Sequence, residues 1–196
     1  MRCPYCRSEL DEQAGDCPSC SLNFPRAMHL LGAMPRIMPG IQDLAAVLTS
    51  RELRKLQRRV EVFEARFPQM RFHMVAQRFS TDHPMDLYAF WMFNSGVLSE
   101  EAHKGSENRD ILLLLDPVTM RVALMVGYGL EPYLPQRSLD QLLIAADPAL
   151  RQQKWLAALL RVVDGLDGLM ETAAKQIAET SGVVTEFDPD RIRGLY

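Results

Sequence analysis

The sequence lacks any long hydrophobic run. Apolar stretches such as residues 111–115 are far shorter than the ~18 residues that a membrane helix needs. The first residues, MRCPYC, also lack the apolar segment of a secretory signal peptide. The formal net charge is only -3, so no overall field favours nucleic acid or an acidic membrane surface. We therefore expect a soluble globular protein with a cytoplasmic location.

Cysteine is absent from the whole sequence after Cys20. The four cysteines, Cys3, Cys6, Cys17 and Cys20, form two C-P-x-C motifs, CPYC and CPSC. Two such turns that face each other supply four thiolates in a tetrahedral arrangement, which suits Zn²⁺ and leaves no open position for water. A segment of about twenty residues cannot bury a core, so metal binding would supply its folding free energy. The pair resembles the knuckles of a short zinc ribbon, a module often found at the N-terminus of bacterial proteins.

Two other roles remain open for these cysteines. CPYC alone is the glutaredoxin active-site motif, but a redox motif follows a strand in a βαβ unit, and only two residues precede this one. Two structural disulfides would require an oxidising compartment, to which nothing in the sequence directs the chain. His29 is a conceivable additional ligand, although four thiolates already close the coordination sphere of zinc.

Proline and glycine gather just after the cysteine module, where the sequence predicts a linker with some apolar content. These apolar side chains would pack against a domain or form an arm that binds a partner. The predicted organisation is a zinc ribbon at residues 1–23, a linker at 24–40, an α/β domain at 41–180 and a C-terminal tail at 181–196.

The main domain alternates helical and extended patterns. A capping box at Thr49–Glu52 begins the first helix, and Pro68 ends it. The expected helices are residues 49–67, 84–93, 138–146 and 152–178, and the expected strands are residues 71–79, 111–115 and 120–126, with a weak edge strand at 183–187 and a long polar loop at 97–109. A helical connection between the first two strands favours a parallel pair, and the DPVT turn predicts a hairpin. The sequence thus predicts a layered α/β fold with a mixed sheet.

Two features of this domain have an ordinary structural interpretation. The outer face of the first helix is basic (Arg51, Arg54, Lys55, Arg58 and Arg59), which favours a solvated face over a nucleic-acid surface because the chain is slightly acidic. We interpret His73, in the first expected strand, as a buried structural histidine.

The sequence at 126–132, VGYGLEP, is close to a dinucleotide fingerprint but lacks its context. The preceding strand returns from a hairpin, and Pro132 stands where a helix amide would be needed. We expect the glycines to permit an unusual backbone turn, with Tyr128 packed beside the sheet.

The order of elements, the sequence DLAAVLT at 43–49, Ala89 and Phe93 in the second helix, and VGYGLE at 126–131 resemble the TPM-domain family over residues 41–178. The resemblance implies a three-layer α/β/α sandwich with a small mixed sheet. Some members resemble acid phosphatases, others are membrane-anchored, and others bind divalent cations at acidic residues near the strand ends. This sequence has Arg109 and Asp110 where the family usually has asparagine and glycine.

Three functions are consistent with these features. The favoured one is a zinc-binding adaptor that recognises a protein partner in the assembly or quality control of a complex. The alternative is a phosphomonoester hydrolase of the TPM family, in which Asp43, Asp110 and Glu131 would hold Ca²⁺ or Mg²⁺ and the cation would clamp a phosphate. Asp116 belongs to the DPVT turn, which is a structural use of aspartate. Nucleic-acid binding through the ribbon and the basic helix is possible but not favoured.

Overall fold

A four-stranded mixed sheet lies at the centre of the protein. The computed structural model describes residues 2–11, 14–32, 38–94 and 108–181. The strands are β1 (Ile41–Asp43), β2 (Arg71–Ala76), β3 (Asp110–Asp116) and β4 (Arg121–Val126), in the order β1-β2-β3-β4. β1, β2 and β3 are parallel, whereas β4 is antiparallel to β3. The expected parallel pair and hairpin are therefore confirmed, while the short strand β1 was not predicted.

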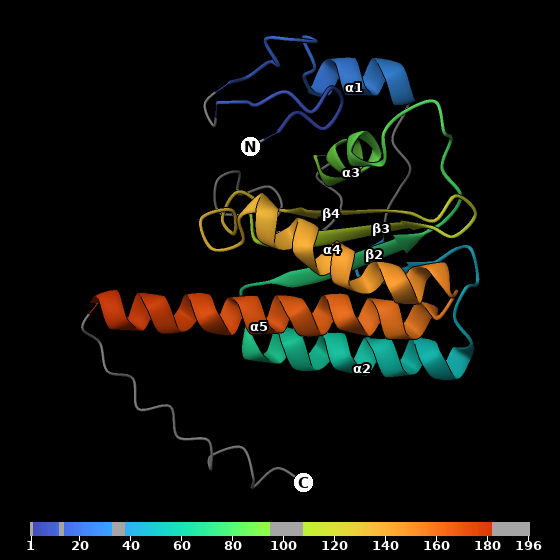
Figure 1. Cartoon of the computed structure of the whole chain (residues 1–196), viewed down its shortest axis with the longest axis vertical. Coiled ribbons are helices and arrows are strands. Elements are labelled where there is room, and N and C mark those ends of the chain that lie inside the picture. Colours follow the sequence, from blue (N-terminus) through green and yellow to red (C-terminus); the bar gives the residue numbers. More distant parts are fainter. Residues whose placement is uncertain (1, 12–13, 33–37, 95–107, 182–196) are drawn as a thin grey trace, which may run out of the picture.

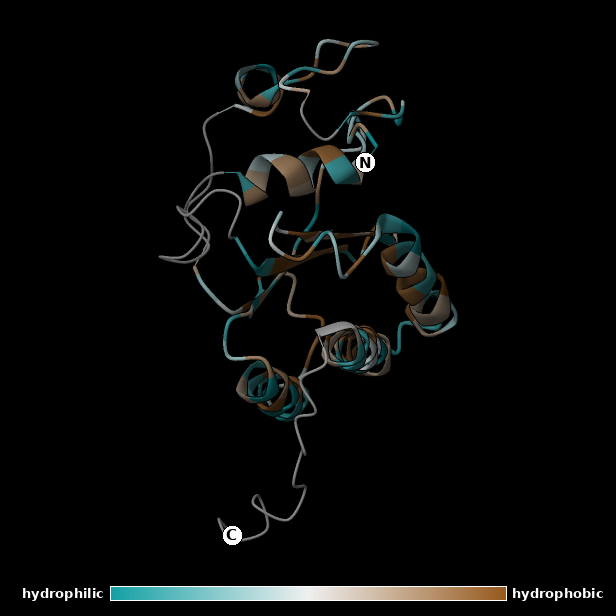
Figure 2. Ribbon diagram, turned by 90° about the vertical axis from the view of Figure 1, so that its left-hand side faces the viewer, coloured by the Kyte–Doolittle hydropathy of each residue, from teal (hydrophilic) through white to brown (hydrophobic). Residues whose placement is uncertain are grey.

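Helices cover both faces of this sheet, as Figures 1 and 2 show. Helices α2 (Ser50–Arg66), α4 (Gln136–Arg151) and α5 (Trp155–Ser181) share one hydrophobic core with one face. Helix α3 (Met85–Phe93) packs on the other face, and α1 (Phe24–Leu31) lies outside α3. The predicted α/β fold with a mixed sheet between helices is confirmed.

Strand β3 is buried along its whole length. Its side chains alternate, so that Ile111, Leu113 and Leu115 enter the core with α2 and α5, while Leu112 and Leu114 enter the core with α3. A continuous apolar run of strand length is typical of a strand covered on both faces, as the sequence indicates.

The segment expected to be a linker begins with a helix. The side chain of Asn23 caps α1 by accepting a hydrogen bond from the Arg26 amide at 2.8 Å, and Pro25 lies in the first turn, where its missing N–H costs nothing. The apolar residues of α1 belong to the same hydrophobic cluster as α3: Phe24, Ala27, Met28, Leu30 and Leu31. The tail segment 183–187 and most of the loop 97–109 lie outside the described residues.

Helix α4 is longer than the sequence predicts. The Asp147-Pro148 pair predicted an end at Ala146, because proline lacks an N–H and crowds the preceding turn. The helix instead continues to Arg151, and Ala149 and Leu150 beyond the proline are buried in the core. Burial of this last turn offsets the single hydrogen bond that Pro148 removes, so the predicted end was wrong.

The capping box of α2 is confirmed, but one part of its basic face is not solvated. Thr49 N donates to Glu52 Oε2 at 2.9 Å, and Glu52 N donates to Thr49 Oγ1 at 3.3 Å. Arg59, expected on the outer face, instead donates to α5 at Asp164 Oδ1 and Asp167 Oδ2, both at 2.6 Å.

Gly127 of VGYGLEP lies in the connection between β4 and α4, and its role there differs from the one that the sequence predicted. Gly127 is required for a close approach: a Cβ there would lie 2.3 Å from the Asn108 carbonyl oxygen. Gly127 N donates to Asp110 O at 2.9 Å, and Gly129 N donates to Asn108 O at 2.8 Å, so the connection is held against the start of β3. Tyr128 is 52% exposed, so the expectation that it packs beside the sheet was wrong.

Gly127→Ala should therefore destabilise the fold by about 2 kcal/mol, because the new methyl group overlaps backbone that is already in place. Gly168→Ala is the matched control, since nothing lies within 4 Å of its added Cβ in α5, and it should stabilise the helix by roughly 0.5 to 1 kcal/mol. Urea unfolding of both variants measures the difference. Equal stabilities would contradict the close contact.

Asp167→Ala tests the connection between α2 and α5. Asp167 is buried and also accepts from Arg66 Nη1 at 2.5 Å, so its removal leaves two guanidinium groups without their shared partner. We expect the free energy of unfolding to fall by about 2 kcal/mol. Asp164, whose side chain is 60% exposed, serves as the comparison, because Asp164→Ala should cost less than about 1 kcal/mol. Thermal and urea unfolding measure both losses. An Asp164→Ala variant that loses as much stability as Asp167→Ala would contradict the prediction.

Candidate metal centre

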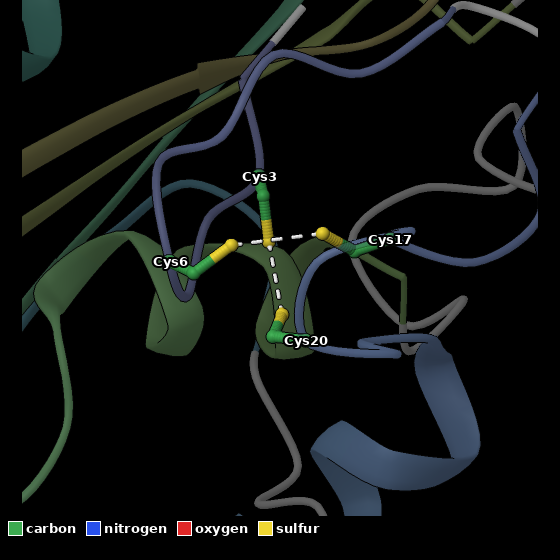
Figure 3. Close-up of side chains that lie close together, drawn as sticks. All are labelled: Cys3, Cys6, Cys17 and Cys20. Atoms are coloured by element: carbon green, nitrogen blue, oxygen red, sulfur yellow. Dashed lines mark hydrogen bonds between the residues drawn. The ribbon is translucent and has the colours of Figure 1, made fainter.

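The four cysteines of the N-terminal module converge on one point (Figure 3). Their sulfur atoms all lie within 4.8 Å of one another. Cys3 Sγ is 3.6 Å from Cys20 Sγ, and Cys6 Sγ is 3.6 Å from Cys17 Sγ. Sulfurs at tetrahedral positions about 2.3 Å from a zinc ion lie about 3.8 Å apart. The arrangement is therefore suited to holding a single metal ion.

Two knuckles of the same backbone design bring these sulfurs together. In the first, Cys3 N donates to Ser8 O and Arg7 N donates to Cys3 O, both at 2.9 Å. In the second, Cys17 N donates to Leu22 O at 2.9 Å and Ser21 N donates to Cys17 O at 2.7 Å. The residue that follows each second cysteine has a positive φ, 62° at Arg7 and 54° at Ser21. The repeated C-P-x-C spacing alone does not express this backbone requirement.

The environment of the sulfurs favours a bound cation. Cys3 and Cys17 are buried, Cys20 is half-buried and Cys6 is exposed. Desolvation raises the pKa of Cys3 and raises the pKa of Cys20 to about 12, whereas hydrogen bonding with Ser8 lowers the pKa of Cys6 to about 6. Thiolates are the metal ligands, and a divalent ion compensates their charge in a site that water does not fully reach. The donor set thus fits a thiophilic ion.

The metal module packs directly on α3. The indole Nε1 of Trp91 donates to the sulfur of Met28 in α1 at 3.2 Å. In the first knuckle, the Tyr5 ring lies 6.1 Å from the His83 ring. Cys3 and Cys17 themselves belong to the hydrophobic cluster that includes α3. The module and the α/β domain therefore share a core, in agreement with the expectation that apolar side chains of the linker would pack against a domain.

The acidic residues considered for a cation lie at different ends of the sheet. Asp43 ends β1 and is level with Leu115, whereas Asp110 begins β3. The two positions are separated by roughly 16 Å along the strands. Glu131 follows β4, which is antiparallel to β3, so it lies toward the Asp110 end. The structure does not bring Asp43 together with Asp110 and Glu131.

Two aspartates at the carboxyl ends of the strands hold backbone in place. Asp43 accepts hydrogen bonds from the amides of Val47 at 3.0 Å and Leu48 at 2.8 Å, just before α2. Asp116 is buried in the hairpin and accepts from the amides of Phe79, Val118 and Thr119. Burial alone would raise the pKa of Asp116, but hydrogen bonding with the Thr119 side chain and with these amides holds the pKa below its ordinary value.

His73 and His29 lie apart from the sulfur cluster. His73 is buried, as expected, and its Nδ1 accepts a hydrogen bond from Gly40 N at 3.0 Å. Its Nε2 lies 3.7 Å from Asp110 Oδ1. His29 is exposed on α1 and does not join the group of four cysteines. Within residues 2–11, 14–32, 38–94 and 108–181, the four cysteines are the only group of three or more His, Cys, Asp or Glu side chains that lie close enough to share an ion.

Comparison with known proteins places the α/β domain in a family. Residues 41–169 match the TPM domain, and the chain belongs to the TPM domain family. The cysteine module lies outside the matched residues. No curated protein matches the sequence.

Two solution NMR structures share the fold. The N-terminal domain of a protein from P. gingivalis is 21% identical, with a TM-score of 0.54 over 68% of this chain and 82% of that one. The N-terminal domain of the cg2496 protein from Corynebacterium glutamicum is 15% identical, with a TM-score of 0.52 over 69% of this chain and 82% of that one. At these identities the likeness establishes the fold alone.

No helix in the part of the chain that the structure describes combines the length and the apolar character needed to cross a membrane.

Metal content provides the direct test of the cysteine cluster. Protein purified under reducing conditions should contain about one thiophilic metal ion per chain. Cys17→Ser should lose that ion, because it replaces a buried thiolate with a weaker ligand, whereas Asp43→Ala should retain it. Elemental analysis measures the stoichiometry, and the absorption bands of the cobalt-substituted protein report tetrahedral sulfur ligation. Equal metal content in the Cys17→Ser and unsubstituted proteins would refute the assignment.

Proposed function

We propose that this chain is a zinc-binding adaptor of the TPM domain family, which recognises a protein partner and does not itself catalyse a reaction. The observation that carries this proposal is the nature of its one converged cluster among the described residues, which consists of four cysteines. Zinc held by Cys3, Cys6, Cys17 and Cys20 has no open position for water or substrate, so it would stabilise the module and not act as a catalyst.

The proposal is supported by the uses already made of the acidic residues. Asp43 and Asp116 accept backbone hydrogen bonds, and a carboxylate engaged in this way is less available to a cation. A Ca²⁺ ion takes six to eight oxygen ligands within about 2.6 Å, so residues at opposite ends of a sheet cannot share it. The role in assembly or quality control of a complex, and a cytoplasmic location, belong to the same proposal. The four cysteines form no disulfide with one another, which matches a compartment that keeps cysteines reduced.

The alternative function is hydrolysis of a phosphomonoester with a divalent cation. One observation favours it: Asp110 and His73 are both 2% exposed and face each other near the end of the sheet where Glu131 lies. Buried carboxylate–histidine pairs occur at catalytic sites, and they also occur in structural networks.

Turnover separates the two functions. The adaptor proposal predicts no hydrolysis of p-nitrophenyl phosphate above background with Ca²⁺, Mg²⁺ or Zn²⁺ present. It also predicts a protein partner that co-purifies in fixed stoichiometry and binds again when both purified proteins are mixed, as calorimetry would measure. Cation-dependent turnover that is abolished by Asp110→Asn would overturn the proposal in favour of the hydrolase. Asp43→Ala is the control, because Asp43 lies elsewhere in the sheet and its loss should leave such turnover in place.

A further inference from the structure

Helix α3 has no polar face. Seven of its nine residues are buried hydrophobic side chains: Met85, Leu87, Tyr88, Ala89, Trp91, Met92 and Phe93. A helix that covers one face of a sheet normally presents a polar stripe to water, whereas a helix that is apolar all round is covered on every side. This helix therefore depends on a second covering layer beyond the sheet.

The sheet covers only the inner side of α3. Val75, Leu112, Leu114 and Ala123 belong to the same hydrophobic cluster and come from β2, β3 and β4. On the outer side lies the N-terminal module, as Figure 2 shows at the top of the view. The α/β domain without this module would expose an apolar helix surface.

Contacts along the length of α3 hold the module in place. Near the carboxyl end, Trp91 bonds Met28, and Ala27 of α1 is fully buried. Near the amino end, Arg7 Nη2 lies 3.6 Å from Asp86 Oδ2, and the tilted ring of Tyr5 lies 6.1 Å from the His83 ring. Both the first knuckle and α1 thus contact the helix.

The covering module has little means of folding without an ion. Among the described residues of the module, the regular structure consists of two knuckles, one isolated bridge between Arg2 and Glu9, and the eight-residue helix α1. An isolated helix of this length is marginal in water, and a segment this small has no core of its own. Two of the metal ligands, Cys3 and Cys17, are also part of the surface that meets α3.

We propose that the four-cysteine module is a metal-dependent cover for α3: the bound ion holds the module closed, and loss of the ion uncovers the apolar surface around Trp91. This inference rests on the proposed zinc site and concerns its regulatory consequence. An exposed apolar surface on a folded domain is the kind of surface through which proteins associate. The cover therefore makes that surface of the adaptor conditional on metal occupancy.

The two tryptophans of the chain allow a direct experiment. Trp91 lies under the module, whereas Trp155 begins α5 on the other side of the sheet. In Trp155→Phe, removal of the metal with a chelator under reducing conditions should shift the Trp91 emission to longer wavelength and increase its acrylamide quenching several-fold. Addition of Zn²⁺ should reverse both changes. In Trp91→Phe, the Trp155 signal should stay constant, which also establishes that the α/β domain remains folded.

A second variant opens the cover without altering a ligand. Ala27→Arg places a charge at a fully buried contact of α1, while His29→Arg places the same charge at an exposed position of the same helix. In the Trp155→Phe background, Ala27→Arg should expose Trp91 with the metal still bound, and His29→Arg should leave it protected.

The outcomes separate the cover from the metal site. Confirmed metal loss with Trp91 still protected would overturn the metal-dependent cover, and would leave the zinc adaptor standing. Protein that never binds metal would refute both the zinc site and the dependence of the cover on metal. The Ala27→Arg result would still decide whether the module covers α3.

Discussion

The burial of β3 on both faces is the constraint on which the rest of this structure depends. Its five central residues are fully buried, and they alternate between two separate cores. Each core requires its own layer of helices, because an apolar sheet face is stable only when another element covers it. Helices α2, α4 and α5 supply one layer, and α3 supplies the other.

Helix α3, which forms the second layer, must itself be covered on its outer side. Because α3 is short and apolar on all sides, covering the sheet with it leaves a new apolar surface, which the cysteine module and α1 then bury. The module contributes buried side chains to the domain, and the domain gives the module a core that it lacks. The convergence of the four cysteines and the packing of α3 are therefore parts of one folding problem, although the cysteines and the helix are distant in sequence.

The predictions that succeeded depend on local chemistry. The capping box, the DPVT hairpin and the apolar run of β3 each specify their structure through neighbours in sequence. Those that failed depend on distant contacts. Pro148 stays within α4 because Ala149 and Leu150 reach the core, and Arg59 leaves the solvated face because α5 brings Asp164 and Asp167 beside it. The periodicity of residues in the sequence carries no information about these distant contacts.

By itself, the sequence determined which four cysteines come together in a cluster that could hold a metal ion, and which family the α/β domain belongs to, because both are expressed in motifs of fixed spacing. Only the tertiary structure decided that Asp43 and Asp110 lie apart, since their separation follows from strand direction and register. It also decided that the metal module lies on α3. A helix without a polar face indicates that some cover exists, but packing alone selects which segment provides it.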